Sequence, residues 1–428
     1  MRLFFFILLL FVSKNLFASD LTFYVDQAHK NNPKLNAERE NLKAIKENIN
    51  ISKGEFLPSL TLSGTQESSQ SYNRTNQSGS TVADTSSDTE TKSIKIDQKI
   101  FQGFQGVNSY KKSHFEFEKA KFQLKKVEQE TILNAVIVYY DLIFKFENED
   151  FNSSNVNLFE RQVESDRARL QKGEINLTDL AQSESSLAGA SASLIKAKTE
   201  LLASKSEFQR ITRVEAPKYE KLLKKPLNIS LPKDFKSALE IAKKNNPKLM
   251  IAKLDAMIAE KELAIEKSKL SPTASINYSK SDSRDFSSSI DENDKETLKA
   301  EINWPIIKGG KNFSSIKKAK HKKLKSDLLL KDIENEVNTS TANAWSTYQS
   351  SESILKSTKS QLQAAEIANE GITLEYDSGS TRTTLDVIQS RALLLNARID
   401  NAKAERDLVI SKFKLLDQLG NLSLNAVN

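Results

Sequence analysis

The 428-residue sequence contains no cysteine. This absence excludes disulfides, thiol catalysis and thiolate metal sites, and it argues against a lipid anchor on an N-terminal cysteine. The only histidines, His29, His114 and His321, are scattered without the spacing of metal ligands. There is also no Gly-rich phosphate loop and no Gly-x-Ser-x-Gly motif. We therefore expect no enzyme, no metal site and no cofactor.

Long apolar runs are also scarce, and the one from Leu3 to Val12 follows the positive Arg2 and precedes the small pair Ala18-Ser19. This order predicts a secretory signal peptide over residues 1–18. Ten apolar residues are too few for a membrane-spanning helix, which needs roughly 20. The balance of 63 basic to 56 acidic residues is only mildly positive, so we expect no nucleic-acid partner.

The chain repeats itself. Residues 30–35 read Lys-Asn-Asn-Pro-Lys-Leu and recur letter for letter at 244–249, and Ile-Phe-Gln-Gly at 100–103 matches Ile-Ile-Lys-Gly at 306–309. This self-similarity predicts two structural repeats, residues 19–213 and 233–428, joined by a linker over 214–232.

Each repeat contains two segments in which apolar and polar residues alternate, which is typical of half-buried strands. The four predicted strands cover about 58–72, 89–102, 272–284 and 296–306. The Ser/Thr/Asn/Asp-rich stretches between them, about 71–91 and 281–295, are expected to be exposed loops. Tyr278 and Trp304 lie in or at the end of such strands, where aromatic residues commonly mark a membrane interface.

Proline is nearly absent from the rest of the chain, and its eight occurrences lie at element borders or in the linker. The gaps between them predict long helices over 104–172, 177–212, 308–377 and 383–419. A helix of 69 residues would be roughly 100 Å long, so we expect coiled-coil packing along its length. The expected class is mainly α with a small membrane β part.

Four strands are too few to close a membrane barrel, which has at least about eight, so strands from several chains must combine. The motifs of the chain then resemble those of the TolC-like outer membrane efflux family. Residues 376–388 read Tyr-Asp-Ser-Gly-Ser-Thr-Arg-Thr-Thr-Leu-Asp-Val-Ile, similar to the family signature Tyr-x-x-Gly-x-Arg-Thr-x-x-Asp-Val-Leu. A fainter copy lies at 173–180, and the Asn-Pro-Lys-Leu helix start occurs in both repeats.

The resemblance implies a homotrimer with a 12-stranded barrel in the outer membrane and a 12-helix tube in the periplasm. It implies a passive exit duct of a tripartite efflux or type I secretion system. The implied partners are outer-membrane lipid, a periplasmic adaptor (membrane fusion) protein and an inner-membrane transporter.

The resemblance also implies a gate at the far end of the tube, near the turns at Gly173 and Gly379. By the motif match, Arg382 and Tyr376 would form polar links with Thr178 and Asp179. Such charge-assisted bonds are directional and could hold a bistable end closed; as ordinary surface ion pairs they would contribute about 0–1 kcal/mol.

Asp386 matches a position that lines the pore constriction in the family, where three copies would form a ring of carboxylates that favours cations. One helical turn later this chain has Gln389 where better-studied members have a second Asp, so the constriction is expected to be less negative. Seven positions separate Gly379 from Asp386, where the family usually has six.

The alternative is a periplasmic coiled-coil adaptor or scaffold, which would also combine an export signal with long helices. Such a protein should lack two membrane-length strand pairs. It should also dissolve without detergent, whereas a duct resists extraction from the outer membrane.

Overall fold

A computed structural model describes residues 21–224, 229–287, 290–379 and 382–427. The predicted signal peptide, the middle of the predicted linker and residues 380–381 of the signature lie outside these ranges. The described chain divides into two compact units, and each draws on both halves of the sequence. The first comprises residues 1–37, 125–247 and 335–428, and the second comprises 38–124 and 248–334.

Helices build the first unit: α1 (Leu21–Asn31), the later part of α3 (Gln105–Gln171), α4 (Leu177–Thr212), α5 (Phe235–Asn245), the later part of α7 (Lys311–Asp377) and α8 (Thr384–Gln418), with short 3-10 turns at Tyr219–Lys221 and Leu424–Ala426. Its core lies where α1 packs on α3, α4 and α8. The ring of Tyr24 contacts those of Tyr139 and Phe208, with centroids 5.8 and 5.0 Å apart. Nearly every apolar side chain from Ile132 to Phe144 is buried, as expected of a stretch that is apolar all round.

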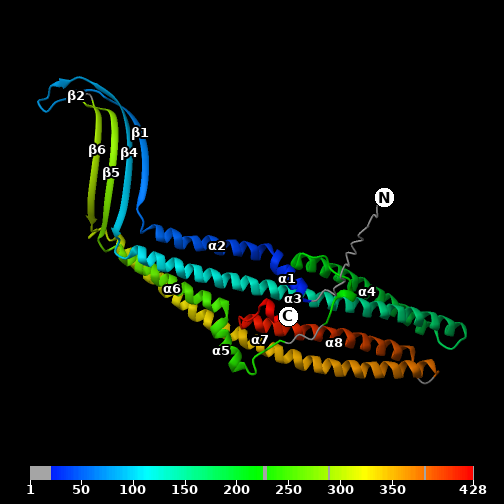
Figure 1. Cartoon of the computed structure of the whole chain (residues 1–428). Helices are drawn as coiled ribbons and strands as arrows, with labels where there is room; N and C mark the ends of the chain where they lie inside the picture. The colour runs from blue at the N-terminus through cyan, green and yellow to red at the C-terminus, as the bar shows by residue number, and fades with distance from the viewer. Residues whose placement is uncertain (1–20, 225–228, 288–289, 380–381, 428) are drawn as a thin grey trace, which may run out of the picture. The chain divides into compact units, whose positions relative to one another are not determined.

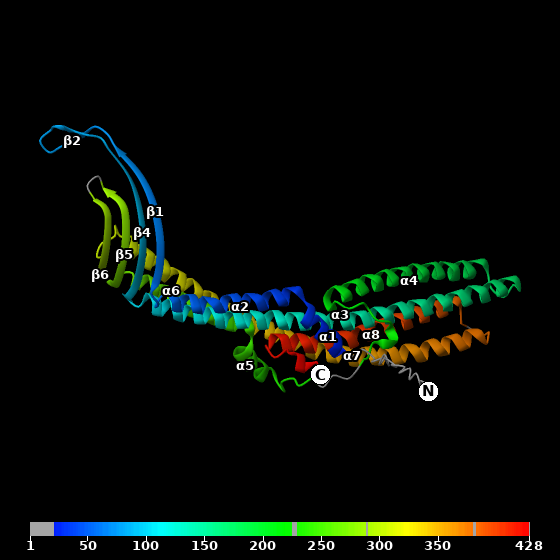
Figure 2. The same ribbon diagram turned by 45° about the horizontal axis from the view of Figure 1, so that its top comes forward.

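The second unit joins a sheet to four helical segments, namely α2 (Pro33–Gly54), α6 (Pro247–Ser268) and the first parts of α3 and α7. The helices are held together partly by polar contacts between their faces. Lys119 pairs with Asp255 at 2.7 Å, and the Ser52 and Ser113 hydroxyls lie 2.6 Å apart. The strands and helices of this unit are seen in Figures 1 and 2.

The sheet has the order β1-β4-β5-β6, and every pair is antiparallel (Figure 1). The strands are β1 (Ser59–Ser71), β4 (Thr85–Phe101), β5 (Thr273–Ser287) and β6 (Ile290–Asn303). A two-stranded ribbon, β2 (Arg74–Thr75) and β3 (Thr81–Val82), lies between β1 and β4 in sequence.

The strands extend into the stretches that were expected to be loops. β4 begins at Thr85 rather than near 89, and β6 begins at Ile290 rather than near 296, although it ends three residues before the predicted 306. The halves of the strands that are nearer the β1–β4 and β5–β6 connections, called the outer halves here, lack an apolar face. Alternation of apolar and polar residues therefore does not mark them as strands. Cross-strand polar pairs stabilise them instead: the Thr91 and Ser283 hydroxyls are 3.1 Å apart, and Lys280 pairs with Glu296 at 2.9 Å.

The half of the sheet that is nearer the helices, called the inner half here, has one exposed apolar face. Leu60, Ile96, Tyr278 and Leu298 are paired in register and form a continuous row across all four strands. Leu298 is 74% exposed and Leu60 66% exposed, so this face is uncovered in one chain. Water-exposed rows of this kind mark a surface that meets lipid or another protein.

Candidate functional site

The candidate site lies in the first unit, where α3 leads into α4 and α7 leads into α8. Gly173 follows α3 and Gly379 follows α7, each with φ +75°. After α3, the Glu174 amide donates to the Arg169 carbonyl at 2.9 Å and the Gly173 amide to the Leu170 carbonyl at 3.0 Å, which is a Schellman ending. Glycine is favoured at both positions because a Cβ disfavours this left-handed conformation.

The helices after the two turns begin with the same device. Asn176 caps α4 by accepting a bond from the Asp179 amide at 2.9 Å, and the Asp179 carboxylate accepts from the Asn176 amide at 3.3 Å. Thr383 and Asp386 repeat this capping box at the start of α8. The Thr383 amide, 2.9 Å from the carboxylate, holds the pKa of Asp386 below its usual value. Both predicted carboxylates therefore have a local role in starting a helix.

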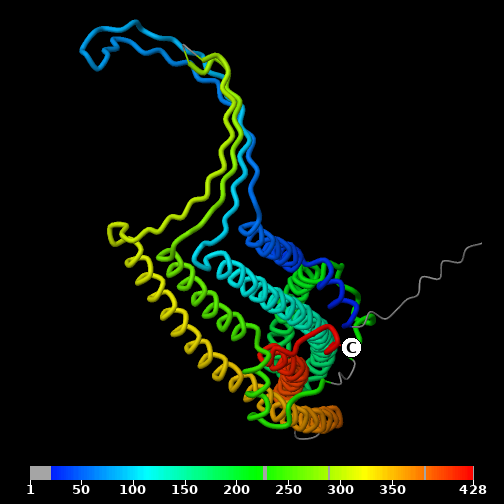
Figure 3. The backbone as a smooth tube through the Cα atoms, turned by 60° about the vertical axis from the view of Figure 1, so that its left-hand side comes forward, coloured from blue at the N-terminus to red at the C-terminus, as the bar shows by residue number. Residues whose placement is uncertain are grey.

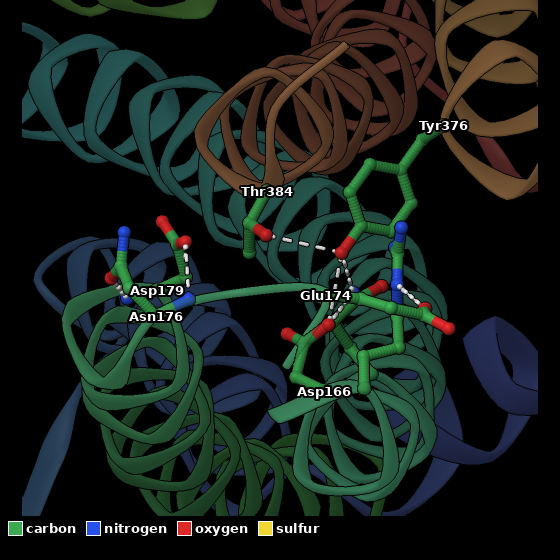
Figure 4. A network of polar contacts seen from close by, with 8 residues as sticks. Asp166, Glu174, Asn176, Asp179, Tyr376 and Thr384 are labelled. Atoms are coloured by element: carbon green, nitrogen blue, oxygen red, sulfur yellow. Dashed lines mark hydrogen bonds and ion pairs between the residues drawn. The ribbon is translucent and has the colours of Figure 1, made fainter. Parts of the chain in front are cut away.

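A buried polar network connects the helical hairpin formed by α3 and α4 to the one formed by α7 and α8. The Asp166 side chain on α3 is fully buried and accepts a bond from the Ser183 hydroxyl on α4 at 2.5 Å. Its other oxygen accepts from the Tyr376 hydroxyl on α7 at 2.9 Å and from the Gln162 amide at 2.9 Å. The Thr384 hydroxyl, at the start of α8, lies 3.1 Å from that of Tyr376. Three helices therefore meet at the Asp166 carboxylate, and α8 joins the network through the Tyr376 hydroxyl (Figure 4).

Two arginines lie beside the hydrogen-bond network of Asp166. The Arg169 guanidinium lies over the Tyr376 ring, 4.6 Å from its centroid. Arg391 donates to the Leu158 carbonyl at 3.3 Å, and burial lowers its pKa even though the charges of Asp377 and Asp166 act to raise it. Burial, reinforced by the nearby Asp166, raises the pKa of Tyr376. The hydroxyl therefore stays protonated and donates its hydrogen to the carboxylate.

Within one chain, the predicted gate residues do not form a single network. Tyr376 contacts Asp166 rather than Thr178 or Asp179, because Asp179 is turned towards Asn176 (Figure 4). Arg382 pairs with Glu375 at 2.5 Å on the surface of the same hairpin. Thr178 and Gln389 are exposed, and Asp386 is half-buried at its helix start.

Asp166 and Ser183 were missed by sequence reasoning, although a signal for them exists. Val156, Phe159 and Val163 recur on α3 with spacings of three and four residues, and the next position of this heptad pattern is Asp166. On α4, Ser183 likewise interrupts the series Leu180, Leu187, Ala190 and Leu194. The last three pack beside Val156 and Phe159 of α3. A polar residue in an apolar seam must find a partner across it.

Within the described ranges, no group of three or more His, Asp or Glu side chains could hold a metal ion. Over the same residues, no helix combines the length and the apolar character needed to cross a membrane. The described contacts of the site are hydrogen bonds between helices and the ion pair of Arg382 with Glu375. Such an arrangement can hold helices together or release them.

Comparison with known proteins gives a family. The family model described as "Outer membrane efflux protein" matches residues 24–212 and 238–421. Outer membrane efflux protein BepC of Brucella suis is 27% identical over 405 residues, which cover 94% of this chain and 86% of BepC. Outer membrane protein TolC of Vibrio cholerae is 24% identical over 430 residues, covering 96% of this chain and 93% of that protein.

Solved structures share the fold. The CmeC outer membrane channel of Campylobacter jejuni superposes with a TM-score of 0.80 at 15% identity, over 94% of this chain and 85% of CmeC. The outer membrane protein VceC of Vibrio cholerae gives a TM-score of 0.78 at 17% identity, over 94% of this chain and 96% of VceC.

Proposed function

Because the chain belongs to the outer membrane efflux protein family, we propose that it is the passive exit duct of a tripartite efflux or type I secretion system. The protein is an outer-membrane channel with a helical extension in the periplasm, which confirms the predicted family and location. Substrates would enter this extension from a pump and leave at the cell surface.

The sheet supports a duct most directly. In the described chain, β1 pairs only with β4 and β6 only with β5, so the sheet has two open edges and an exposed apolar face. Unpaired backbone groups in lipid cost several kcal/mol each, so the edges must be paired in a membrane. We propose that the β6 edge of one copy pairs with the β1 edge of the next. That three copies form the ring is implied by the family resemblance.

The proposed partners follow from the same membership. The family resemblance implies a transporter in the inner membrane and an adaptor that bridges the periplasm. We place the adaptor contact at the turn ends of the hairpins, where Leu177 and Leu374 are 70% and 63% exposed. Exposed apolar side chains at a helix end are typical of protein docking surfaces.

We further propose that the Asp166 network is the part of the gate that acts within each chain. It joins the α3–α4 hairpin to the α7–α8 hairpin through the bond between Asp166 and Tyr376, so opening must break this bond. Arg382, Thr178 and Asp179 would add links between neighbouring copies, beyond the contacts of one chain. Asp386 and Gln389 would line the constriction, with Gln389 weakening its negative charge.

Single-channel conductance in a planar bilayer tests the duct and the gate together. We expect small, cation-selective openings for the wild type and a several-fold larger conductance for Arg382→Ser, because the gate would lose a link in every copy. If the wild type conducts and the variant is unchanged, the duct stands but Arg382 is not a gate residue. If no channel forms and the protein stays in solution without detergent, the duct is wrong and a periplasmic scaffold replaces it.

A further inference from the structure

Lysines crowd the stretch that follows the last strand. Eight of the 18 residues from 308 to 325 are lysines, and no Asp or Glu occurs among them: Lys308, Lys311, Lys317, Lys318, Lys320, Lys322, Lys323 and Lys325. The corresponding stretch of the first half, residues 102–119, has three lysines and two glutamates. This concentration is marked in a chain whose overall balance of 63 basic to 56 acidic residues is only mildly positive.

The lysines of the second half are also less neutralised. In the part of the chain that the structure describes, only Lys323 among the eight has an ion pair, with Asp327 at 2.6 Å. Glu262 and Glu266 line a shared hollow with Lys318 and Lys322 and offset these two in part. In the first half, Lys112 pairs with Glu262 at 3.1 Å and Lys119 with Asp255 at 2.7 Å. Unpaired positive charge close to a membrane is available for an external anion.

The cluster begins directly beneath the apolar half of the sheet. β6 ends at Asn303, and a short connection leads from it to α7 (Figure 3). In this connection Trp304, Ile306 and Ile307 are 61%, 72% and 85% exposed. Trp304 is fixed by a bond from its indole N–H to the Leu270 carbonyl at 3.1 Å. An exposed tryptophan and two isoleucines at the end of a membrane strand are suited to the boundary between acyl chains and headgroups.

Distance along the helix decides which lysines can reach that boundary. α7 starts at Lys311, so Lys317 lies about 9 Å and Lys320 about 14 Å along its axis at 1.5 Å per residue. Lysine side chains extend towards charged partners while their stems cover apolar surface. Lys308, Lys311, Lys317 and Lys320 are all exposed. Lys325 lies about 21 Å from the helix start, so its charge is screened more strongly at the boundary and contributes less.

We propose that residues 304–320 form a binding site for anionic phospholipid in the leaflet that faces the periplasmic helices. The apolar connection enters the headgroup region, and the four exposed lysines bind lipid phosphates. The argument rests on charge complementarity and on continuity with the membrane-spanning sheet. The site occurs once in each chain, because the first-half counterpart lacks the charge.

Quenching of Trp304 by brominated lipid tests this site in the full-length protein. The chain has two tryptophans, so Trp345→Phe leaves Trp304 as the reporter. The protein is reconstituted in zwitterionic bilayers that contain a minor fraction of either brominated phosphatidylglycerol or brominated phosphatidylethanolamine. We expect about threefold stronger quenching by the anionic lipid, and equal quenching when Lys308, Lys311, Lys317 and Lys320 are all replaced by Gln or when 0.5 M salt is added.

A matched variant controls for net charge. Replacing the exposed Lys196, Lys198, Lys356 and Lys359 of the first unit by Gln removes the same charge and should leave the preference intact. The proposal would be overturned if both lipids quenched Trp304 equally in the protein that keeps all its lysines. It would also be overturned if the preference for the anionic lipid remained after the four lysines were replaced. Binding of purified peptidoglycan that depends on these lysines, when no lipid preference exists, would overturn it as well. If neither lipid quenches Trp304, both the lipid site and the membrane placement of the sheet are wrong at this position. The conductance measurement then decides whether the proposed duct is wrong as well.

Discussion

At the scale of single residues, the Tyr376 hydroxyl links the two hairpins through the buried Asp166 carboxylate. Tyr376→Phe removes its bonds to Asp166 and Thr384 and leaves the ring in place. A hydrogen bond to a charged group contributes about 1.5–3 kcal/mol, so the closed end should weaken by that order in each chain. We expect a several-fold larger single-channel conductance than in the wild type.

Tyr348→Phe is the matched control for this measurement. Tyr348 lies on the same helix, and in the described part of the chain its hydroxyl makes no hydrogen bond. Its loss should leave the conductance unchanged. Similar conductance in Tyr376→Phe and Tyr348→Phe would show that the Asp166 network does not hold the end closed.

Asp417, near the end of α8, predicts a pH-dependent stability. Burial raises its pKa to about 6; the Gln418 amide and Lys126 act to lower it, and Glu130 acts to raise it. The unfolded carboxyl has a pKa of about 3.9. Between about pH 4 and 6 the folded chain therefore keeps a proton that the unfolded chain loses, and the free energy of unfolding falls as the pH rises through this window.

Asp417→Asn should remove this dependence. At pH 8 we expect the variant to be more stable than the wild type by about 1–3 kcal/mol, because an uncharged side chain replaces a partly buried carboxylate. At pH 4 the two proteins should have similar melting temperatures. Asp400→Asn, at an exposed position on the same helix, is the control. A melting-temperature difference for Asp417→Asn that is the same at both pH values would contradict the assignment.

At the scale of secondary structure, the long helices were the most predictable elements. The prediction placed them at 104–172, 177–212, 308–377 and 383–419, and the structure has them at Gln105–Gln171, Leu177–Thr212, Lys311–Asp377 and Thr384–Gln418. The absence of proline from these stretches indicates long helices, because proline lacks the amide hydrogen that a helix interior requires, and glycines at 173 and 379 mark the turns between them. The strands were less predictable because their outer halves are polar on both faces, and alternation then carries no signal.

The Asp166 network was unpredictable from motifs because its members lie far apart in the sequence. Asp166 precedes Tyr376 by 210 residues, and only the packing of α3 against α7 brings them together. The motif match placed Tyr376 and Arg382 opposite Thr178 and Asp179, but within one chain Asp179 is used by its own helix cap. The division into repeats 19–213 and 233–428 stays a prediction, and the similar capping boxes at the starts of α4 and α8 support it.

At the scale of the whole molecule, the open edges of the sheet require a partner that one chain does not supply. Closed rings form when a heterologous contact repeats around an axis, and a contact that does not close gives open chains of copies. The contact proposed here joins β6 of one copy to β1 of the next. Because the protein has no cysteine, an introduced pair can report this contact without side reactions.

Because the chain has no cysteine, disulfide crosslinking can test the proposed contact between β6 and β1. Single cysteines placed along β1, at Thr61, Ser63 or Thr65, are combined with single cysteines along β6, at Lys295, Thr297 or Lys299. After mild oxidation of membranes, at least one combination should give covalent dimers and trimers on a denaturing gel. The ladder should stop at three chains, because closure of the ring leaves no free edge.

Thr91→Cys with Ser283→Cys is the matched control. These positions are directly opposite each other on the inner strands β4 and β5, so their disulfide should form within one chain and leave a monomer band. A ladder that continues beyond three chains would mean that the edges do not close into a trimer. Monomers in every β1–β6 combination, with the control disulfide formed, would mean that another element covers the edges, and the shared sheet would then be wrong.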